Sequence, residues 1–173
     1  MSELVSPATS ASGLDHSEER TGVRDFDFLH GRWLVHNRRR PRSATCPTEW
    51  EEFEGRSVVR AFWDGAGNME EWEASPRGGI IRAISLHLYD AGAHQWRLHW
   101  APQRDGRVGV PTVGSFDRGR GEFFAQEDIA GRSTLLRNTW EELSAYECRW
   151  EQSFSHDGGR SWQLDWTMAF TRE

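Results

Sequence analysis

Two glutamates with tryptophans close by, Glu52 and Glu70, are the residues of this chain best suited to acid–base chemistry. Glu52 follows Trp50 and Glu70 precedes Trp72, each with one residue between, so each pair faces one side of a β-strand. A carboxyl group buried among indole rings loses hydration, which raises its pKa toward neutrality and suits it to general acid or base catalysis. We therefore identify Glu52 and Glu70 as candidate catalytic residues.

Strand pairing is expected to bring both glutamates onto one interior face. A two-residue turn at Glu54 and Gly55 would join strands 48–53 and 56–63, and a further turn would lead into strand 68–75. A register error of one residue in a strand would instead send its polar side chains to solvent. Besides the two glutamates, the shared face carries four candidate ligand-binding residues: Trp50, Trp63, Asn68 and Trp72.

Polar and aromatic side chains in phase with the apolar faces of other strands are further candidates for ligand binding. Each uncompensated polar group in a core costs on the order of 1–3 kcal/mol, so a polar cavity explains this many of them most economically. Tryptophan rings would wall such a cavity and hold an aromatic or cationic guest; the alternative is that most of them fill the core. The candidates are Asn37, Trp100, Asn138, Trp140, Trp150, Gln152 and Trp166.

The sequence predicts neither a metal site nor a bound cofactor. With Leu88 opposite Trp96 across the intervening turn, His87 and His99 lie on the outer face and lack a third ligand. The sequence has no Ser-His-Asp or Cys-His arrangement, no Gly-rich phosphate loop and no cluster with metal-ligand spacing. Cys148 is expected in the core as a small apolar residue and not as a nucleophile.

Composition and charge restrict the partners of the chain. A net charge of −6, with a basic cluster only at Arg38 to Arg40, argues against nucleic acid and against an anionic membrane. No apolar run approaches the roughly 20 residues that span a bilayer. Cys46 and Cys148 suggest no disulfide framework, and the acidic N-terminal segment is no secretory signal. We expect a cytoplasmic protein with a small-molecule partner, and a homodimer is also compatible with the sequence.

The period-two alternation from Trp33 onward, with regular turn clusters, predicts an all-β fold. Residues 1–24 have no period and are expected to form a disordered tail, whereas 25–173 form a single closed antiparallel barrel of about ten strands. Asp25 to Leu29 can form one helical turn, a short N-terminal plug for one barrel end. Near the C-terminus, the pattern Ser-x-Asp-x-Gly-x-Ser-Trp at 155–162 predicts a hairpin turn held by Asp157.

The tripeptide Gly31-x-Trp33 at the start of the first strand resembles the calycins, the group of lipocalins and fatty-acid-binding proteins. That resemblance implies that Trp33 packs across the closed end of the barrel under an Arg from a late strand, for which Arg172 is the candidate. The ordered segments FDFLHGRW, TEWEEFEG, WRLHWA and RWEQSFSHDGGRSW are together similar to a bacterial family of uncharacterised calycin-like domains, over roughly residues 25 to 172. The family implies a fold and no reaction.

Two classes of function fit these residues. The first is a cofactor-independent acid–base enzyme in which Glu52 or Glu70 transfers a proton to or from a small aromatic or cation-forming substrate. Condensation, cyclisation of the iminium (Pictet-Spengler) type, isomerisation and dehydration all suit that chemistry. The second is a non-catalytic carrier or sensor, which would use the same cavity only to recognise a small hydrophobic ligand.

Overall fold

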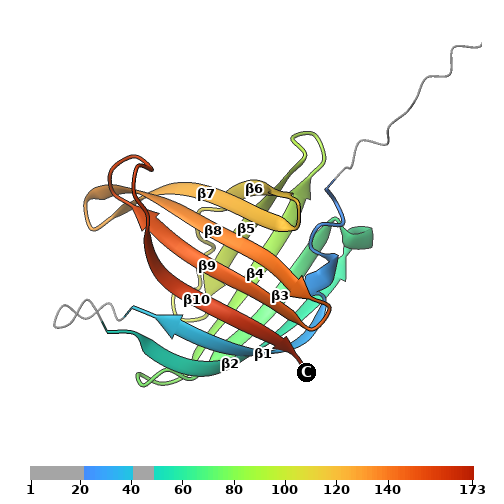
Figure 1. The fold of residues 1–173 in the computed structure, drawn as a ribbon, viewed down its shortest axis with the longest axis horizontal. Coiled ribbons are helices and arrows are strands. Elements are labelled where there is room, and N and C mark those ends of the chain that lie inside the picture. Colours follow the sequence, from blue (N-terminus) through green and yellow to red (C-terminus); the bar gives the residue numbers. More distant parts are fainter. Residues whose placement is uncertain (1–21, 41–48) are drawn as a thin grey trace, which may run out of the picture.

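The computed structural model describes residues 22–40 and 49–173, in which ten antiparallel strands close into one barrel (Figure 1). Each strand pairs with its neighbours along the chain, and β1 closes the barrel by pairing with both β2 and β10. The predicted all-β antiparallel barrel is thereby confirmed. The strands are β1 Gly31–Arg39, β2 Glu51–Phe62, β3 Gly67–Ala74, β4 Ile81–Asp90, β5 Gln95–Pro102, β6 Thr112–Asp117, β7 Arg120–Ile129, β8 Arg132–Ser144, β9 Glu147–Ser155 and β10 Gln163–Arg172.

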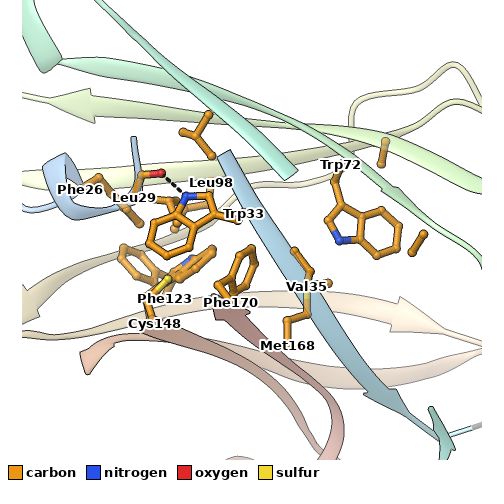
Figure 2. Close-up of a cluster of buried hydrophobic side chains, with 14 of the residues drawn as sticks. Phe26, Leu29, Trp33, Val35, Trp72, Leu98, Phe123, Cys148, Met168 and Phe170 are labelled. Carbon is orange, nitrogen blue, oxygen red and sulfur yellow. Dashed lines mark hydrogen bonds between the residues drawn. The ribbon is translucent and has the colours of Figure 1, made fainter. Parts of the chain in front are cut away.

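One end of the barrel is filled by aromatic side chains around Trp33. The Trp33 indole Nε1 donates a hydrogen bond of 2.8 Å to the carbonyl of Leu29, and the Arg172 guanidinium lies 4.1 Å from the indole centre. Arg172 also donates to the carbonyls of Phe28 and His30, both at 2.8 Å. Figure 2 shows Trp33 beside Leu29 and Phe170. The expected Trp33–Arg172 contact is confirmed.

Helix is almost absent from the barrel. The helical plug predicted over 25–29 is not borne out, because the only helical residues there form a three-residue 3-10 helix, η1 Asp27–Leu29. A second 3-10 helix, η2 Trp63–Gly65, links β2 to β3. Most of the tail predicted over 1–24 lies outside the described residues. Gly22 already contacts the barrel, because its carbonyl accepts a 3.0 Å hydrogen bond from the Trp96 indole. Within the described residues, no helix is long and apolar enough to cross a membrane.

The hairpin predicted at Glu54 and Gly55 is wrong, because β2 runs through both residues without a turn. Gly55 lies opposite Val35 on one side and Ala74 on the other. A Cβ atom at Gly55 would come within 2.7 Å of the Glu73 carbonyl oxygen, so this glycine permits close strand approach and makes no turn. Without this turn, the residues before Glu54 face the opposite way from the prediction, so that Phe53 points inward and Glu52 outward.

The pairing of β4 with β5 also differs by one residue from the prediction. Tyr89, not Leu88, lies opposite Trp96, and His87 lies opposite Leu98. Asp90 explains the difference, because its carboxylate accepts backbone N–H bonds from Gly92 and Ala93 and keeps these residues in the turn. The odd-numbered residues of β4 therefore face inward, and His87 is buried in the barrel.

The strands β8 and β9, and β10 from Trp166 onward, keep the predicted faces, although their register differs; Leu164 lies opposite Ser153 and not Gln152, so its predicted facing is wrong. Trp150 lies opposite Met168 and Gln152 opposite Trp166, two residues from the predicted pairs. One residue of this shift arises at the hairpin turn, where Phe154 lies opposite Gln163 and not Trp162, and the other arises from a β-bulge in β10 between Leu164 and Trp166. Cys148 is free and buried, as expected.

The hairpin between β9 and β10 is held by Asp157, as predicted. The Asp157 carboxylate accepts bonds from the Ser161 amide at 2.9 Å and from the Ser161 hydroxyl at 2.6 Å. The Ser155 hydroxyl donates to the same carboxylate at 2.8 Å. These hydrogen bonds favour the ionised form and lower the pKa of Asp157 to about 2.

Candidate functional site

A cavity of about 680 Å³ occupies the barrel interior. Strand ends and loops remote from η1 border it, including Pro102, Arg107, Val110 and Ile129. Because these residues lie at the end of the strands opposite the Trp33 cluster, the cavity has its mouth there. The cavity is large enough for a drug-sized organic molecule.

Glu70 on β3 is a buried carboxyl on the cavity wall, with only 3% of its surface exposed. The Ser57 hydroxyl donates to Glu70 Oε1 at 2.7 Å, and Ser85, its direct neighbour on β4, provides another hydrogen bond. Burial raises the pKa of Glu70 above its usual 4.5, against the opposing effect of the two serines. The group is therefore a proton donor over a wider pH range than an exposed glutamate.

Four tryptophans form a continuous aromatic wall of the cavity. Trp72 lies 5.6 Å from both Trp100 and Trp166, measured between ring centres, and Trp150 lies 5.6 Å from Trp166. The rings meet at 62° to 87°, which is the favourable edge-to-face arrangement. Trp72 Nε1 is buried and has no hydrogen-bond partner among the described residues. The wall thus offers ring surface and one unused donor.

A chain of neutral polar groups lies across the barrel from Glu70. The Gln152 amide donates to Asn138 Oδ1 at 3.2 Å, and the Asn138 amide approaches the Thr112 hydroxyl at 3.4 Å. Asn138 is on β8, which in the closed ten-strand order lies five strands from β3 in either direction. Groups that can hydrogen-bond a ligand therefore stand on opposite walls.

His87 on β4 is a cavity residue that sequence reasoning placed on the outer face. Only 3% of its surface is exposed, and the side chain borders the cavity. The imidazole lies beside the Phe26 ring, with ring centres 4.7 Å apart. Burial, with a smaller effect of His99, lowers the pKa of His87 to about 3. The imidazole is therefore neutral near pH 7. The sequence Asp90-x-Gly92 is the signal for its position, because a turn that begins at Asp90 pairs Tyr89 with Trp96 and directs His87 inward.

Most of the predicted ligand-binding residues gather in the cavity wall, together with Glu70. Two others face inward without bordering the cavity: Asn37, which accepts a 3.2 Å bond from Trp166 Nε1, and Asn68, which is fully buried. The predicted residues that border the cavity are Glu70, Trp72, Trp100, Asn138, Trp140, Trp150, Gln152 and Trp166.

Three predicted site residues lie outside the cavity. Trp50 and Glu52 do so because the turn expected within β2 does not form, and Trp63 does so because β2 ends at Phe62 and Trp63 begins η2. Glu52 faces outward, with 54% of its side chain exposed, and pairs with Arg38 at 3.0 Å. Trp63 follows β2 in η2 and is 69% exposed. Trp50 precedes β2 and lies against Arg38 and Arg40. The inward facing predicted for these three residues is wrong.

No three His, Cys, Asp or Glu side chains gather as a metal site within residues 22–40 and 49–173. No protein-family model matches the sequence, and no curated protein matches it.

Solved structures resemble the fold. The S-type phycobiliprotein lyase CPES from Guillardia theta superposes with a TM-score of 0.58 and 11% identity, over 86% of this chain and 90% of that one. A de novo designed fluorescence-activating β-barrel gives a TM-score of 0.47 and 8% identity, over 85% of this chain and 95% of that one. At such identities, the likeness to the lyase shows a shared barrel fold.

Proposed function

We propose that this protein is a cofactor-independent enzyme that uses Glu70 as its general acid and base on a small aromatic or cation-forming molecule held inside the barrel. The observation that carries the proposal is a buried carboxyl with a raised pKa on the wall of a cavity of about 680 Å³. Groups whose pKa is shifted by burial in a cavity concentrate at functional sites.

The surroundings of Glu70 suit a substrate that becomes positively charged during reaction. Protonated Glu70 donates its proton to the substrate, and the resulting carboxylate then stabilises the cation and takes the proton back. The faces of Trp72, Trp100 and Trp166 can attract the same cation through their π-electrons. Asn138 and Gln152 orient the substrate from the opposite wall. Iminium-type condensation or cyclisation, isomerisation and dehydration all use these steps.

A carrier or sensor of a small hydrophobic ligand is the second candidate. The Gln152–Asn138–Thr112 chain favours it, because these neutral groups recognise a ligand and transfer no proton at neutral pH. We also infer that the barrel is of the calycin type, with the Trp33–Arg172 contact at its closed end. Within that group both binding and catalysis are compatible with the geometry.

Capture of the natural ligand distinguishes the two functions. The purified protein is equilibrated with the small-molecule fraction of a cell extract, and bound species are identified by native mass spectrometry. The captured compound is then incubated with wild type, Glu70→Gln and the matched surface control Glu52→Gln. An enzyme changes the compound, and Glu70→Gln slows that change by about 10²–10⁴-fold with little loss of affinity, whereas Glu52→Gln does not. A compound that stays chemically unchanged with wild type contradicts the enzyme and supports the carrier.

A further inference from the structure

His87 and Glu70 occupy neighbouring positions on one stretch of the cavity wall. Glu70 on β3 lies directly opposite Ser85 on β4, and Asn68 lies directly opposite His87. Glu70 and His87 are thus diagonal neighbours, a relation in which Cα atoms of adjacent strands lie about 7–8 Å apart. Both side chains border the cavity, so one small molecule can contact both.

The hydrogen-bonding capacity of His87 is not used up by the protein. Its Nδ1 atom is buried and has no partner in the described part of the chain, and the same is true of both amide atoms of Asn68 opposite. A buried donor or acceptor without a partner costs about 1–3 kcal/mol, and a histidine with a purely structural role is normally hydrogen-bonded. The unpartnered atom, on a residue that borders the cavity, indicates a contact made by a bound molecule.

We propose that His87 is the base of this site and accepts a proton from the bound molecule through an imidazole nitrogen, while Glu70 supplies one. The proposal rests on the proposed function and deepens it by dividing the two roles given there to Glu70: His87 becomes the base, and Glu70 remains the acid. It also defines the substrate class: an aromatic compound that carries an acidic C–H or N–H near an atom that gains a proton.

The surroundings of the two residues favour these opposite roles. Burial lowers the pKa of His87 to about 3 and raises that of Glu70, so burial favours the neutral form of each group. A neutral imidazole accepts a proton and a neutral carboxyl donates one, and divergent environments of this kind typically mark an acid and base pair. His99 on β5 is the titratable group that affects His87, and Glu70 affects the thiol of Cys148 on β9.

The ring opening of 5-nitrobenzisoxazole provides a probe reaction for a base in an aromatic cavity. The base removes the proton from the ring carbon, the electron pair of that C–H bond forms the nitrile, and the N–O bond breaks. The oxygen leaves as a coloured phenolate, which can take a proton from Glu70. The reaction consumes no oxidant or reductant and needs no other reactant.

The test compares wild type, His87→Gln and Glu52→Gln, with binding of the probe followed separately by tryptophan fluorescence. Wild type is expected to accelerate the ring opening over buffer, with a rate that stays constant from about pH 5 to 8 because the imidazole is already deprotonated. His87→Gln should lose about 10²-fold of the acceleration while Glu52→Gln loses none.

Three results would overturn the role of His87. An unchanged rate in folded His87→Gln does so, and so does a wild-type rate that rises with pH through a single titration and vanishes in Glu70→Gln, which would make the Glu70 carboxylate the base. The wild-type pH profile decides the matter even if His87→Gln fails to fold. Wild type that binds the probe without accelerating it contradicts the role of His87 alone, whereas the proposed function fails only if the captured natural ligand is not changed.

Discussion

Replacing Glu70 by Gln should stabilise the protein at neutral and alkaline pH. Gln has nearly the same shape, and its carbonyl oxygen can still accept the hydrogen bond from Ser57 that Glu70 accepts at 2.7 Å. Its amide group can donate to the hydroxyl of Ser85, which is the direct cross-strand neighbour. The substitution therefore removes the ionisable group and leaves the packing intact.

The effect must depend on pH in a defined direction. In the unfolded chain Glu70 titrates near 4.5, whereas burial raises its pKa in the folded barrel. Well below pH 4.5, Glu70 is protonated in both the folded and the unfolded state, so the folded protein bears no cost from a buried carboxylate. As the pH rises from 4.5 through the folded-state pKa, the unfolded chain binds fewer protons than the folded one, so the free energy of unfolding falls. Glu70→Gln has no such loss.

At pH 8 we expect Glu70→Gln to exceed wild type by about 1–3 kcal/mol, the usual cost of an incompletely compensated buried polar group. In a domain of this size each kcal/mol shifts the Tm by roughly 2–4 °C. Urea denaturation of both proteins between pH 4 and 8 measures the difference directly. Glu52→Gln is the control, because an exposed ion pair contributes at most about 1 kcal/mol. Parallel curves for wild type and Glu70→Gln, or a less stable variant at pH 8, would refute the assigned burial of Glu70.

Three further substitutions test the fold. Trp33→Ala should lower the free energy of unfolding by about 3–5 kcal/mol, measured by urea denaturation, because it empties the closed end; unchanged stability would contradict its place in the core. Gly55→Ala should lower the free energy of unfolding by about 1–3 kcal/mol, since its Cβ would lie 2.7 Å from the Glu73 carbonyl oxygen. Unchanged stability would contradict the continuous β2 and favour the predicted turn at this position. Asp157→Ala should lower the Tm at pH 7, and the difference should close as the pH falls from 3.8 through about 2, because wild type loses this contribution when Asp157 is protonated in the fold. A Tm difference independent of pH would contradict the role of the carboxylate in the hairpin.

The sequence predicts the barrel well because alternation along a strand is a local property. It also predicts the inward faces of β8, β9 and the part of β10 from Trp166 onward, since the register there is shifted by two residues and a shift of two leaves each side chain on the same face. Errors of one residue have the opposite effect. They predict Glu52 inside and His87 outside. His87 belongs to a correctly predicted strand, whereas the segment of Glu52, predicted as a separate strand over 48–53, is continuous with the next one in β2.

These two errors have a common physical origin. Gly55 has the composition of a turn, but close contact with β3 is what requires glycine there. Within β4, the apolar residues at 84, 86 and 88 favour an inward face for the even-numbered positions, yet Ile84 is 42% exposed. Only long-range pairing decides such cases. Glu70 was assigned correctly because the link from Trp63 to Gly67 leaves the phase of β3 unchanged.

Ligand binding inside the barrel is tested most directly by filling the cavity without touching Glu70. Leu136 on β8 borders the cavity, so Leu136→Trp can direct its larger ring into empty space and keep the fold. Native mass spectrometry then compares both proteins after equilibration with the same small-molecule extract. We predict one organic molecule per wild-type chain and little or none bound to folded Leu136→Trp. Equal occupancy of the two proteins would place the ligand outside the barrel and contradict the site described above.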